Sequence, residues 1–270
     1  MTICTSSDAV IVSCESLDST DPRAVIDSSI SFVNALQREL LRPSEISRQA
    51  YLSYYVDYYL VQIENGGFSQ FVYNSKWNAQ VVEFVREGLK EMGSTRHLEL
   101  FDEGASKVTS LGGRIRAFFA SSYFGRNIVR DGLDGVTDRF FLLNKTEDLV
   151  SLNDKWLRGL KSLQAIPRDE MPEAVAVRAA AVPDREKRDA DVRANEPLWL
   201  KQIRALCAAT EQRYLRATAA DSFAYEGKDF LAYHFVTEKG HHFMIEANGS
   251  TILFNGETEE RLAAIPALRH

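Results

Sequence analysis

Acidic side chains on two predicted helices are the residues of this sequence whose spacing could do chemistry. The first group recurs every four residues, which on a helix places its carboxylates on one side, about 6 Å apart along the axis. A second group follows on the next predicted helix. Exposed carboxylates attract the lysines and arginines of another protein. We therefore predict a binding surface for a partner protein with a basic surface, formed by Glu83, Glu87, Glu91, Glu99, Asp102 and Glu103.

Basic residues on the first helix could neutralise this surface. Arg86 and Lys90 follow Glu83 and Glu87 by three residues, a spacing that allows ion pairs along a helix. Exposed ion pairs contribute only about 0–1 kcal/mol each, and they would make the helix an ordinary salt-bridged surface. Duplex DNA carries a charge about every 3.4 Å along each strand, so a single row is too sparse to imitate DNA. Both helices would have to act together.

Signals for catalysis and for bound metals or cofactors are weak. The sequence holds no Gly-x-Ser-x-Gly elbow and no glycine-rich phosphate loop. His234, His241 and His242 could converge on a metal across adjacent strands, but no cysteine or carboxylate lies at zinc-like spacing from them. We therefore expect a non-enzymatic protein with no catalytic residue, no metal site and no cofactor.

Charge and cysteine usage indicate the compartment. A net charge of −6 and an isoelectric point near 5.5 argue against direct nucleic-acid binding, which needs a basic surface. Cys4, Cys14 and Cys207 lack metal or redox spacing, which favours a reducing compartment. The apolar run Ala9 to Val12 is too short for a signal peptide or a membrane span. We expect a bacterial-type cytoplasmic protein that contacts neither nucleic acid nor membranes directly.

The densest aromatic and apolar segment covers residues 51–74. Its tyrosines fall at helical spacing among leucine, valine and isoleucine, which predicts a helix that is buried on nearly all sides. Asn65-Gly-Gly67 interrupts the pattern, because these residues tolerate the positive φ that closes a helix, and Phe68 restarts it. We expect a structural turn in which the amides of Asn65, Gln70 and Asn74 tie the chain together.

The segments around this turn form one constellation. They are Tyr55-Val-Asp57, Asn65-Gly-Gly-Phe-Ser-Gln-Phe71, Tyr73-Asn-Ser75 and a helix ending in Gly88-Leu-Lys-Glu-Met-Gly93. Together they resemble the nineteen-kilodalton DNA mimic protein family over residues 25–165. The resemblance implies a mostly helical, non-enzymatic domain that presents carboxylates in place of DNA phosphates and occupies a DNA-binding protein. It also implies a structural and candidate binding motif, made of Asn65, Gly66, Gly67, Phe68, Gln70, Phe71 and Asn74.

Apolar periodicity and capping residues predict the remaining elements of this domain. Helices are expected over residues 23–41, 79–92, 96–110, 114–123 and 146–163. The Asp- and Gly-rich residues 127–137 are expected to form a loop, and Phe140 to Leu143 a buried run. Residues 1–22 are expected to be a flexible N-terminal arm, followed by the helical domain over residues 23–166.

The last third of the chain has a different pattern. Four of the seven prolines lie between Pro167 and Pro197, which predicts a Pro- and charge-rich connector over residues 167–196. Residues 197–270 are expected to form a small α+β module, to which the family resemblance does not extend. Its predicted elements are a helix to about residue 210, strands over 230–237, 242–246 and 251–254, a candidate fourth strand over 214–219 and a closing helix over 258–265.

The Asn248-Gly249 pair between two of these strands is a strong hairpin signal. The expected fold class is therefore mainly α, with a helical N-terminal domain followed by a small α+β module that contains an antiparallel β-meander.

Two functions from different classes fit these features. The first, which we favour, is a protein-binding regulator that occludes a partner. The partner would be a DNA-binding protein if the chain acts as a DNA mimic, or a nuclease-type toxin if it acts as an immunity protein. The second is an enzyme or small-ligand-binding protein with a site between the helical domain and the meander, built from the amides near Asn65 and the histidines. The net charge does not distinguish the first domain as the more acidic one. Residues 1–165 hold 21 Asp/Glu and 18 Lys/Arg, and the remaining residues hold 17 Asp/Glu and 14 Lys/Arg, so each part has a net charge of −3.

Overall fold

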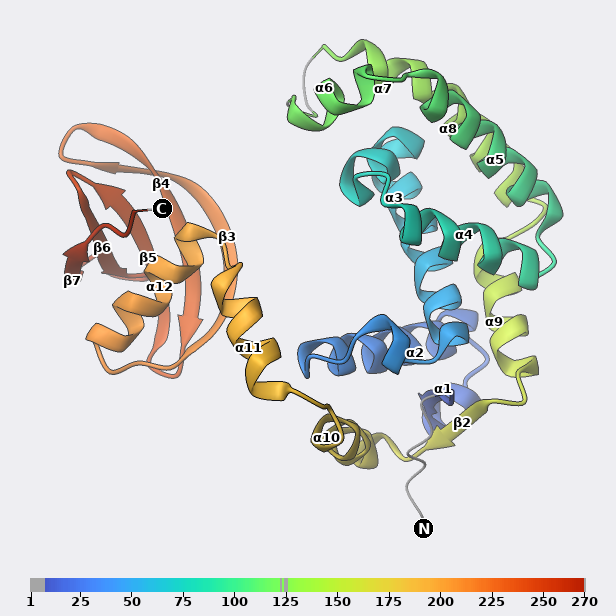
Figure 1. Cartoon of the computed structure of the whole chain (residues 1–270), viewed down its shortest axis with the longest axis horizontal. Helices are drawn as coiled ribbons and strands as arrows, with labels where there is room; N and C mark the ends of the chain where they lie inside the picture. The colour runs from blue at the N-terminus through green and yellow to red at the C-terminus, as the bar shows by residue number, and fades with distance from the viewer. Residues whose placement is uncertain (1–7, 122, 124–125, 270) are drawn as a thin grey trace. The chain divides into compact units, whose positions relative to one another are not determined.

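A computed structural model describes residues 8–121, 123 and 126–269 of the chain (Figure 1). The chain divides into two compact units, Met1–Pro183 and Asp184–His270. Helices build most of the first unit, and the second contains a five-stranded antiparallel sheet with a helix packed on it. The expected fold class, mainly α with a small α+β module at the C-terminal end, is confirmed.

The helices of the first unit follow the predicted pattern through most of its length. They are α1 (Cys14–Asp18), α2 (Pro22–Arg38), α3 (Arg48–Ser75), α4 (Ala79–Glu91), α5 (Thr95–Ser110), α6 (Arg114–Ala120), α7 (Ile128–Leu133), α8 (Gly135–Asn144), α9 (Leu149–Gly159) and α10 (Met171–Ala180). Short 3-10 turns precede α3 (η1, Pro43–Glu45) and α10 (η2, Arg168–Glu170). Asn78 caps α4, because its side-chain oxygen accepts the N–H groups of Gln80 and Val81 at 2.9 and 3.3 Å.

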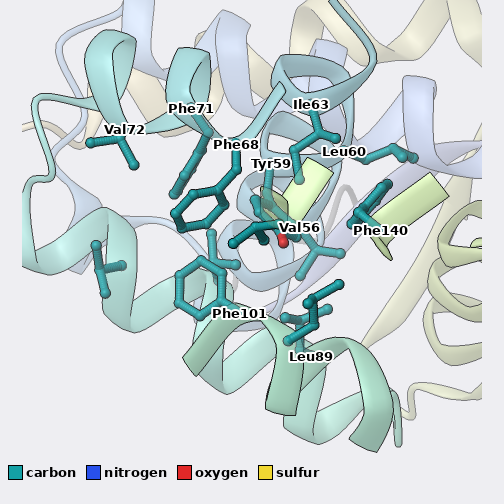
Figure 2. Packing of buried hydrophobic residues seen from close by; sticks show 14 of the residues in the cluster. Val56, Tyr59, Leu60, Ile63, Phe68, Phe71, Val72, Leu89, Phe101 and Phe140 are labelled. Carbon is teal, nitrogen blue, oxygen red and sulfur yellow. The ribbon is translucent and has the colours of Figure 1, made fainter. Parts of the chain in front are cut away.

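Helix α3 is the centre of the first unit, as its apolar surface predicts. It packs against α2, α4, α8 and α9. The fully buried Tyr59 ring meets four phenylalanine rings edge-on (Figure 2). The centroid of the Tyr59 ring lies 5.1 Å from that of Phe71, 5.2 Å from that of Phe101, 5.6 Å from that of Phe140 and 6.4 Å from that of Phe68. Aromatic pairs are favourable in this geometry. One aromatic cluster thus joins α3, α5 and α8.

We expect replacement of Tyr59 by phenylalanine to stabilise the protein. Burial raises the pKa of Tyr59, and none of the described residues forms a hydrogen bond with its hydroxyl. Because burying an unpaired hydroxyl costs about 1–3 kcal/mol, Tyr59→Phe should raise the free energy of unfolding by about 1 kcal/mol in urea denaturation. Tyr51→Phe is the control, because the Tyr51 hydroxyl accepts a hydrogen bond from Gln37 at 3.1 Å. Destabilisation by Tyr59→Phe would show that the hydroxyl is paired.

Residues 10–18 correct the expectation of a flexible arm. Val10–Ser13 forms β1, which pairs in parallel with β2 (Leu163–Ile166), and α1 follows directly. The β1 side chains are buried in a cluster that includes Val25 and Ile26 of α2. The partner strand lies at the other end of the helical unit, so no local sequence pattern reveals the pairing. The part of the predicted arm before residue 8 lies outside the described residues.

The segment 127–137, expected as a loop, instead forms α7 and the beginning of α8. Leu133 and Val136 are buried in the aromatic core, so tertiary packing outweighs the low helix propensity of the neighbouring glycines. The predicted helix over 146–163 is shorter. It begins as α9 after Asp148, whose carboxylate accepts the Ser151 N–H at 2.9 Å.

Residues 167–196 are not a single solvated connector. They contain η2, α10 and α11 (Arg185–Ala194). Helix α10 packs against α2, and its Ala174 and Ala179 are buried. The alanine-rich stretch therefore packs against the rest of its unit, which the sequence alone did not indicate. The division between the two compact units falls after α10, and the limits of independently folding domains stay a prediction.

Limited proteolysis is expected to cut the exposed segment between α10 and α11. A fragment covering residues 1–183 should stay helical, because α10 still covers α2 in it. A fragment ending at residue 166 should be less stable, because it lacks the buried Ala174. Mass spectrometry of the fragments and their thermal melting by circular dichroism test both statements. First cleavage elsewhere, with residues 181–185 protected, would mean that the two units behave as one domain.

The second unit is built around an antiparallel meander. Its strands are β3 (Tyr214–Tyr225), β4 (Lys228–Thr237), β5 (Gly240–Ala247), β6 (Ser250–Asn255) and β7 (Arg261–Pro266), paired in that order. Asn248 and Gly249 have φ values of 51° and 75°, as a two-residue hairpin turn with positive φ requires. The three predicted strands and the candidate fourth strand are confirmed, the latter over a longer range.

The predicted closing helix over residues 258–265 is wrong. Most of these residues lie in β7, which pairs with β6 and places Ile265 opposite Thr251. The Leu-Ala-Ala run has good helix propensity, but hydrogen bonding to a sheet edge outweighs it.

Alternation along the strands gives the sheet two apolar faces. Helix α12 (Leu198–Ala209) covers one face, where its Ile203 and Leu206 share a core with Phe235 and other buried residues. The other face carries Phe243, whose ring lies 4.7 Å from that of Phe223 in the β3–β4 hairpin. When both faces of a sheet are covered, the sequences of its central strands are apolar at consecutive positions. The sequences of β5 and β6 have this pattern.

Candidate partner-binding surface

The Asn-Gly-Gly motif forms a sharp break inside α3. Gly67 has φ 83° and ψ 179°, and the helical segment resumes at Phe68. The Phe68 N–H, which the break leaves without its helical acceptor, donates to Thr137 Oγ1 at 2.9 Å. The positive φ therefore belongs to Gly67, whereas Gly66 has an extended φ of −169°. Phe68 and Phe71, which follow the break, are fully buried in the aromatic core.

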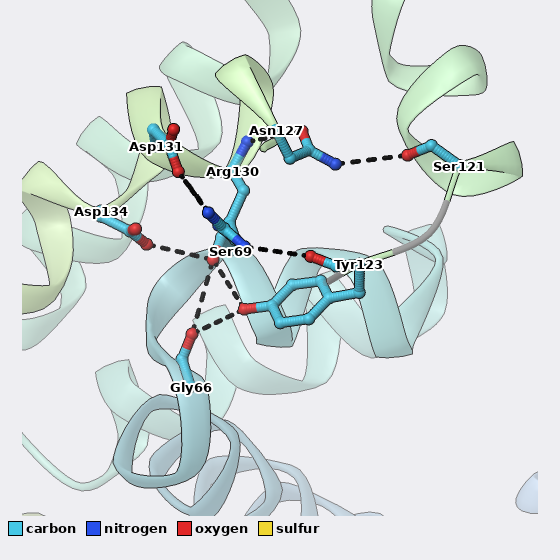
Figure 3. Close-up of polar contacts among 8 residues, drawn as sticks. All are labelled: Gly66, Ser69, Ser121, Tyr123, Asn127, Arg130, Asp131 and Asp134. Atoms are coloured by element: carbon cyan, nitrogen blue, oxygen red, sulfur yellow. Dashed lines mark hydrogen bonds and ion pairs between the residues drawn. The ribbon is translucent and has the colours of Figure 1, made fainter. Parts of the chain in front are cut away.

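Polar side chains close the break from the outside (Figure 3). The Tyr123 hydroxyl donates to the carbonyl of Gly66 at 2.8 Å, and Ser69 Oγ lies 3.0 Å from the same hydroxyl and 3.1 Å from Asp134 Oδ1. Arg130 holds this group in place, since it donates to the Tyr123 carbonyl at 3.2 Å. Ser69 is fully buried and therefore inaccessible to a substrate. The cluster joins α3 to α7 and α8.

Two of the three predicted amides tie the helix halves together. Gln62 Oε1, before the break, accepts hydrogen bonds from Gln70 Nε2 at 3.2 Å and from Asn74 Nδ2 at 2.6 Å. Asn65 is exposed, and its side chain makes no hydrogen bond with the described residues. The motif is thus structural at most of its positions. Asn65 and Asn74 are its exposed residues, and of these two only Asn74 forms a side-chain hydrogen bond with a described residue.

The first predicted carboxylate group is paired by an arginine from another helix. Arg48, in the first turn of α3, donates to both oxygens of Glu87, with Nε at 2.7 Å from Oε1, and lies 3.1 Å from Glu83 Oε1. Its guanidinium also lies over the Phe84 ring, 5.3 Å from the centroid. These hydrogen bonds hold the pKa of Glu87 below its usual value.

The second group is paired in the same way. Arg86 of α4 lies 2.7 Å from Asp102 Oδ1 of α5, which places the two helices side by side. Glu103 contacts Arg139 of α8 at 2.5 Å and Lys107 at 4.0 Å. The six carboxylates therefore do not form one uninterrupted acidic row. Four of them pair with arginines of α3, α4 and α8, and only Glu91 and Glu99 lack an ion pair with a described residue.

An open groove lies beside these carboxylates, between α5 and α8, with a volume of about 580 Å³. It is lined by Arg96, Glu99, Leu100, Glu103, Arg139, Leu142, Leu143 and Thr146. The side chains of Leu142 and Phe141 are 65% and 41% exposed. The run Phe140 to Leu143 is thus only half buried, because a helix turns Phe140 and Leu143 inward and the two residues between them outward. That spacing is the signal by which the sequence could have revealed the groove.

The histidines of the second unit separate into two faces of the sheet. His234 and His241 lie together, with Nδ1 of the former 3.1 Å from Nε2 of the latter, whereas His242 is buried on the opposite face. Burial lowers the pKa of His242. Among the described residues, no group of three or more His, Cys, Asp or Glu side chains is arranged to hold a metal ion.

The alternative site between the helical domain and the meander stays a prediction. The amides and the histidines assigned to it lie in different units. None of the helices in the part of the chain that the structure describes has the length and apolar character needed to cross a membrane.

One comparison with known proteins matches a segment within the helical unit. Residues 44–160 match the DMP19-like protein family, which confirms the predicted resemblance to the DNA mimic proteins over this range. No curated protein and no solved structure matches the chain. The matched residues include the break in α3, the paired carboxylates of α4 and α5, and the groove between α5 and α8.

Proposed function

We propose, from this match, that the chain is a non-enzymatic protein-binding regulator that occludes the basic surface of a partner. The observation that carries the proposal is that one matched segment holds both the carboxylates and an open groove with exposed apolar side chains. Its contact surface consists of α4, α5 and α8. A DNA-binding protein fits this surface best, because its basic site would meet carboxylates where it otherwise meets phosphates.

Ion pairing within the chain is compatible with this role. The arginines hold Glu87, Asp102 and Glu103 in fixed positions and leave them on the surface. Exposed pairs of this kind are worth only about 0–1 kcal/mol, so the cations of a partner can compete for the same carboxylates. Glu91 and Glu99 can bind cations of the partner without first giving up an ion pair within the chain. The exposed Leu142 adds an apolar contact that DNA phosphates do not supply.

Capture of the partner and its release by DNA test the proposal. The full chain is immobilised, exposed to a cytosolic extract of its source organism, and washed with duplex DNA of about 20 base pairs at constant ionic strength. We expect a captured protein to be released by duplex DNA and to bind the chain when purified. A captured protein that duplex DNA does not displace would contradict occlusion of a DNA-binding surface.

The same experiment separates the two kinds of partner. A nuclease-type toxin, the partner of an immunity protein, would be identified by its cleavage of DNA and by inhibition of that cleavage when the chain is added in equal amount. A transcription factor or another DNA-binding protein would lose DNA binding without any cleavage activity. An active enzyme site in the chain itself would show turnover without a protein partner, which would overturn the proposal.

A further inference from the structure

We propose that His234 and His241 form a binding site for a divalent transition metal ion such as Zn²⁺ on the second unit. The two residues lie on adjacent strands, β4 and β5. In the register of this pair, His234 is opposite Phe243 and His241 is opposite Val236, so the two histidines are diagonal neighbours on one face of the sheet. This site is independent of the proposed function of the helical unit.

The rings present their nitrogens to each other. Nδ1 of His234 lies 3.1 Å from Nε2 of His241, the ring centroids are 5.2 Å apart, and the rings are inclined by only 22°. The nitrogens are thus the closest parts of the two rings, which face each other edge to edge. Any ion between the rings would meet one nitrogen from each strand.

A carboxylate orients the first of these rings. Asp221 Oδ1 of β3 lies 2.9 Å from Nε2 of His234, so Nε2 carries the proton and Nδ1 presents its lone pair toward His241. A histidine that binds a metal through one nitrogen typically donates its other N–H to a carboxylate. The Asp221–His234 pair has this arrangement before any metal is bound.

The separation of the nitrogens suits two ligands of one ion. Two nitrogens at about 2.0–2.1 Å from a tetrahedral zinc ion are about 3.3 Å apart, so the rings need to open by only a few tenths of an ångström. The same 3.1 Å also suits a plain N–H···N hydrogen bond between the rings, which is the competing interpretation. Imidazole nitrogen favours zinc, copper and nickel, whereas magnesium and calcium take oxygen ligands.

The surroundings hold the rings and leave the site accessible. The His234 ring packs against the ring of Phe243, with 5.1 Å between the centroids. A Cβ on residue 256 would lie 2.2 Å from Nδ1 of His241, so the glycine at this position leaves room for the His241 ring. The His234 side chain is 18% exposed and that of Asp221 is 63% exposed. Two protein ligands leave the other coordination positions to water or to a group from another molecule.

Isothermal titration of the full chain with Zn²⁺ at pH 7.5 tests the proposal. We expect one site. Each of His234→Gln and His241→Gln should lower its affinity more than tenfold, and Asp221→Asn should lower it about 10- to 100-fold. Affinity should fall as the solution is made more acidic, because protonated histidines do not bind metal. His242→Gln, on the opposite face, and His270→Gln, at the chain end, are the controls and should bind Zn²⁺ normally.

A second measurement guards against misfolded variants. Circular dichroism must show the wild-type fold in each variant, and electron paramagnetic resonance of bound Cu²⁺ should report two nitrogen ligands in the wild type and one in His241→Gln. Absence of Zn²⁺ binding to the wild type, unchanged affinity in both histidine variants, or loss of binding in His270→Gln would each overturn the proposal in favour of a hydrogen-bonded pair or an adventitious site.

Discussion

Replacing Gly67 by alanine should lower the free energy of unfolding by about 3 kcal/mol or more. Gly67 has φ 83° and ψ 179°, a backbone conformation that essentially only glycine adopts. A Cβ at this position would also lie 2.7 Å from Thr137 Oγ1, the atom that accepts the Phe68 N–H. Alanine therefore strains the backbone and disturbs the hydrogen bond that anchors the break. Urea denaturation followed by circular dichroism measures the loss.

Gly66→Ala is the matched control, one residue earlier in the same motif. Its φ of −169° is extended, and a Cβ there would meet only the side chain of Gln70, with Oε1 at 2.0 Å. That amide can rotate away, at the expense of its hydrogen bond to Gln62, which is worth about 1 kcal/mol. The two variants should thus differ by about 2 kcal/mol or more. Equal losses would show that the left-handed conformation of Gly67 does not define the turn.

The break in α3 also contributes to the proposed contact surface, although most of its residues are buried. Thr137 and Asp134, which bind the segment after the break, lie at the beginning of α8. The later residues of the same helix, Arg139 and Leu142, line the groove next to α5. The motif is therefore best understood as the support of this surface. Of the motif's residues, Asn65 and Asn74 are exposed and can contact a partner themselves.

The sequence predicted the features that depend on neighbouring residues. The apolar surface of α3, the cap at Asn78 and the Asn248-Gly249 turn are local, and the structure contains all three. The fold class follows from such patterns, because the period of the apolar residues changes from helical to extended after the prolines. Ends of helices were predicted less well, since packing decides the last turn.

Features that depend on distant residues could not be predicted from local patterns. Strand β1 has its partner β2 at the far end of the helical unit, and β7 is a strand because β6 offers it hydrogen bonds. The carboxylates show the same limit. Their spacing predicts where they lie on α4 and α5, but the arginines that pair with Glu87 and Glu103 come from α3 and α8. Only the tertiary structure brings these arginines close.

Removing these arginines should strengthen binding of the partner. If a basic partner contacts Asp102 and Glu103, then Arg86 and Arg139 compete with it for the same carboxylates, 2.7 and 2.5 Å away. Because such a pair is worth up to about 1 kcal/mol, Arg86→Gln and Arg139→Gln should each raise the affinity of the captured partner up to about fivefold. Reversing Glu91, Glu99 and Asp102 to lysine should lower it more than tenfold, or by about 1.4 kcal/mol. Isothermal titration measures both changes.

Arg116→Gln is the matched control for net charge. Arg116 is exposed on α6 and forms no ion pair with a described residue, so this variant makes the protein equally more acidic without freeing a carboxylate. Its effect on affinity should be small. All differences should shrink at 0.5 M salt, because exposed charges are then screened over only about 4 Å. If Arg86→Gln and Arg139→Gln bind the partner no better than Arg116→Gln, and the triple reversal binds as the wild type does, the six carboxylates do not meet the partner. The contact must then lie at Asn65 and its neighbours or on the C-terminal sheet.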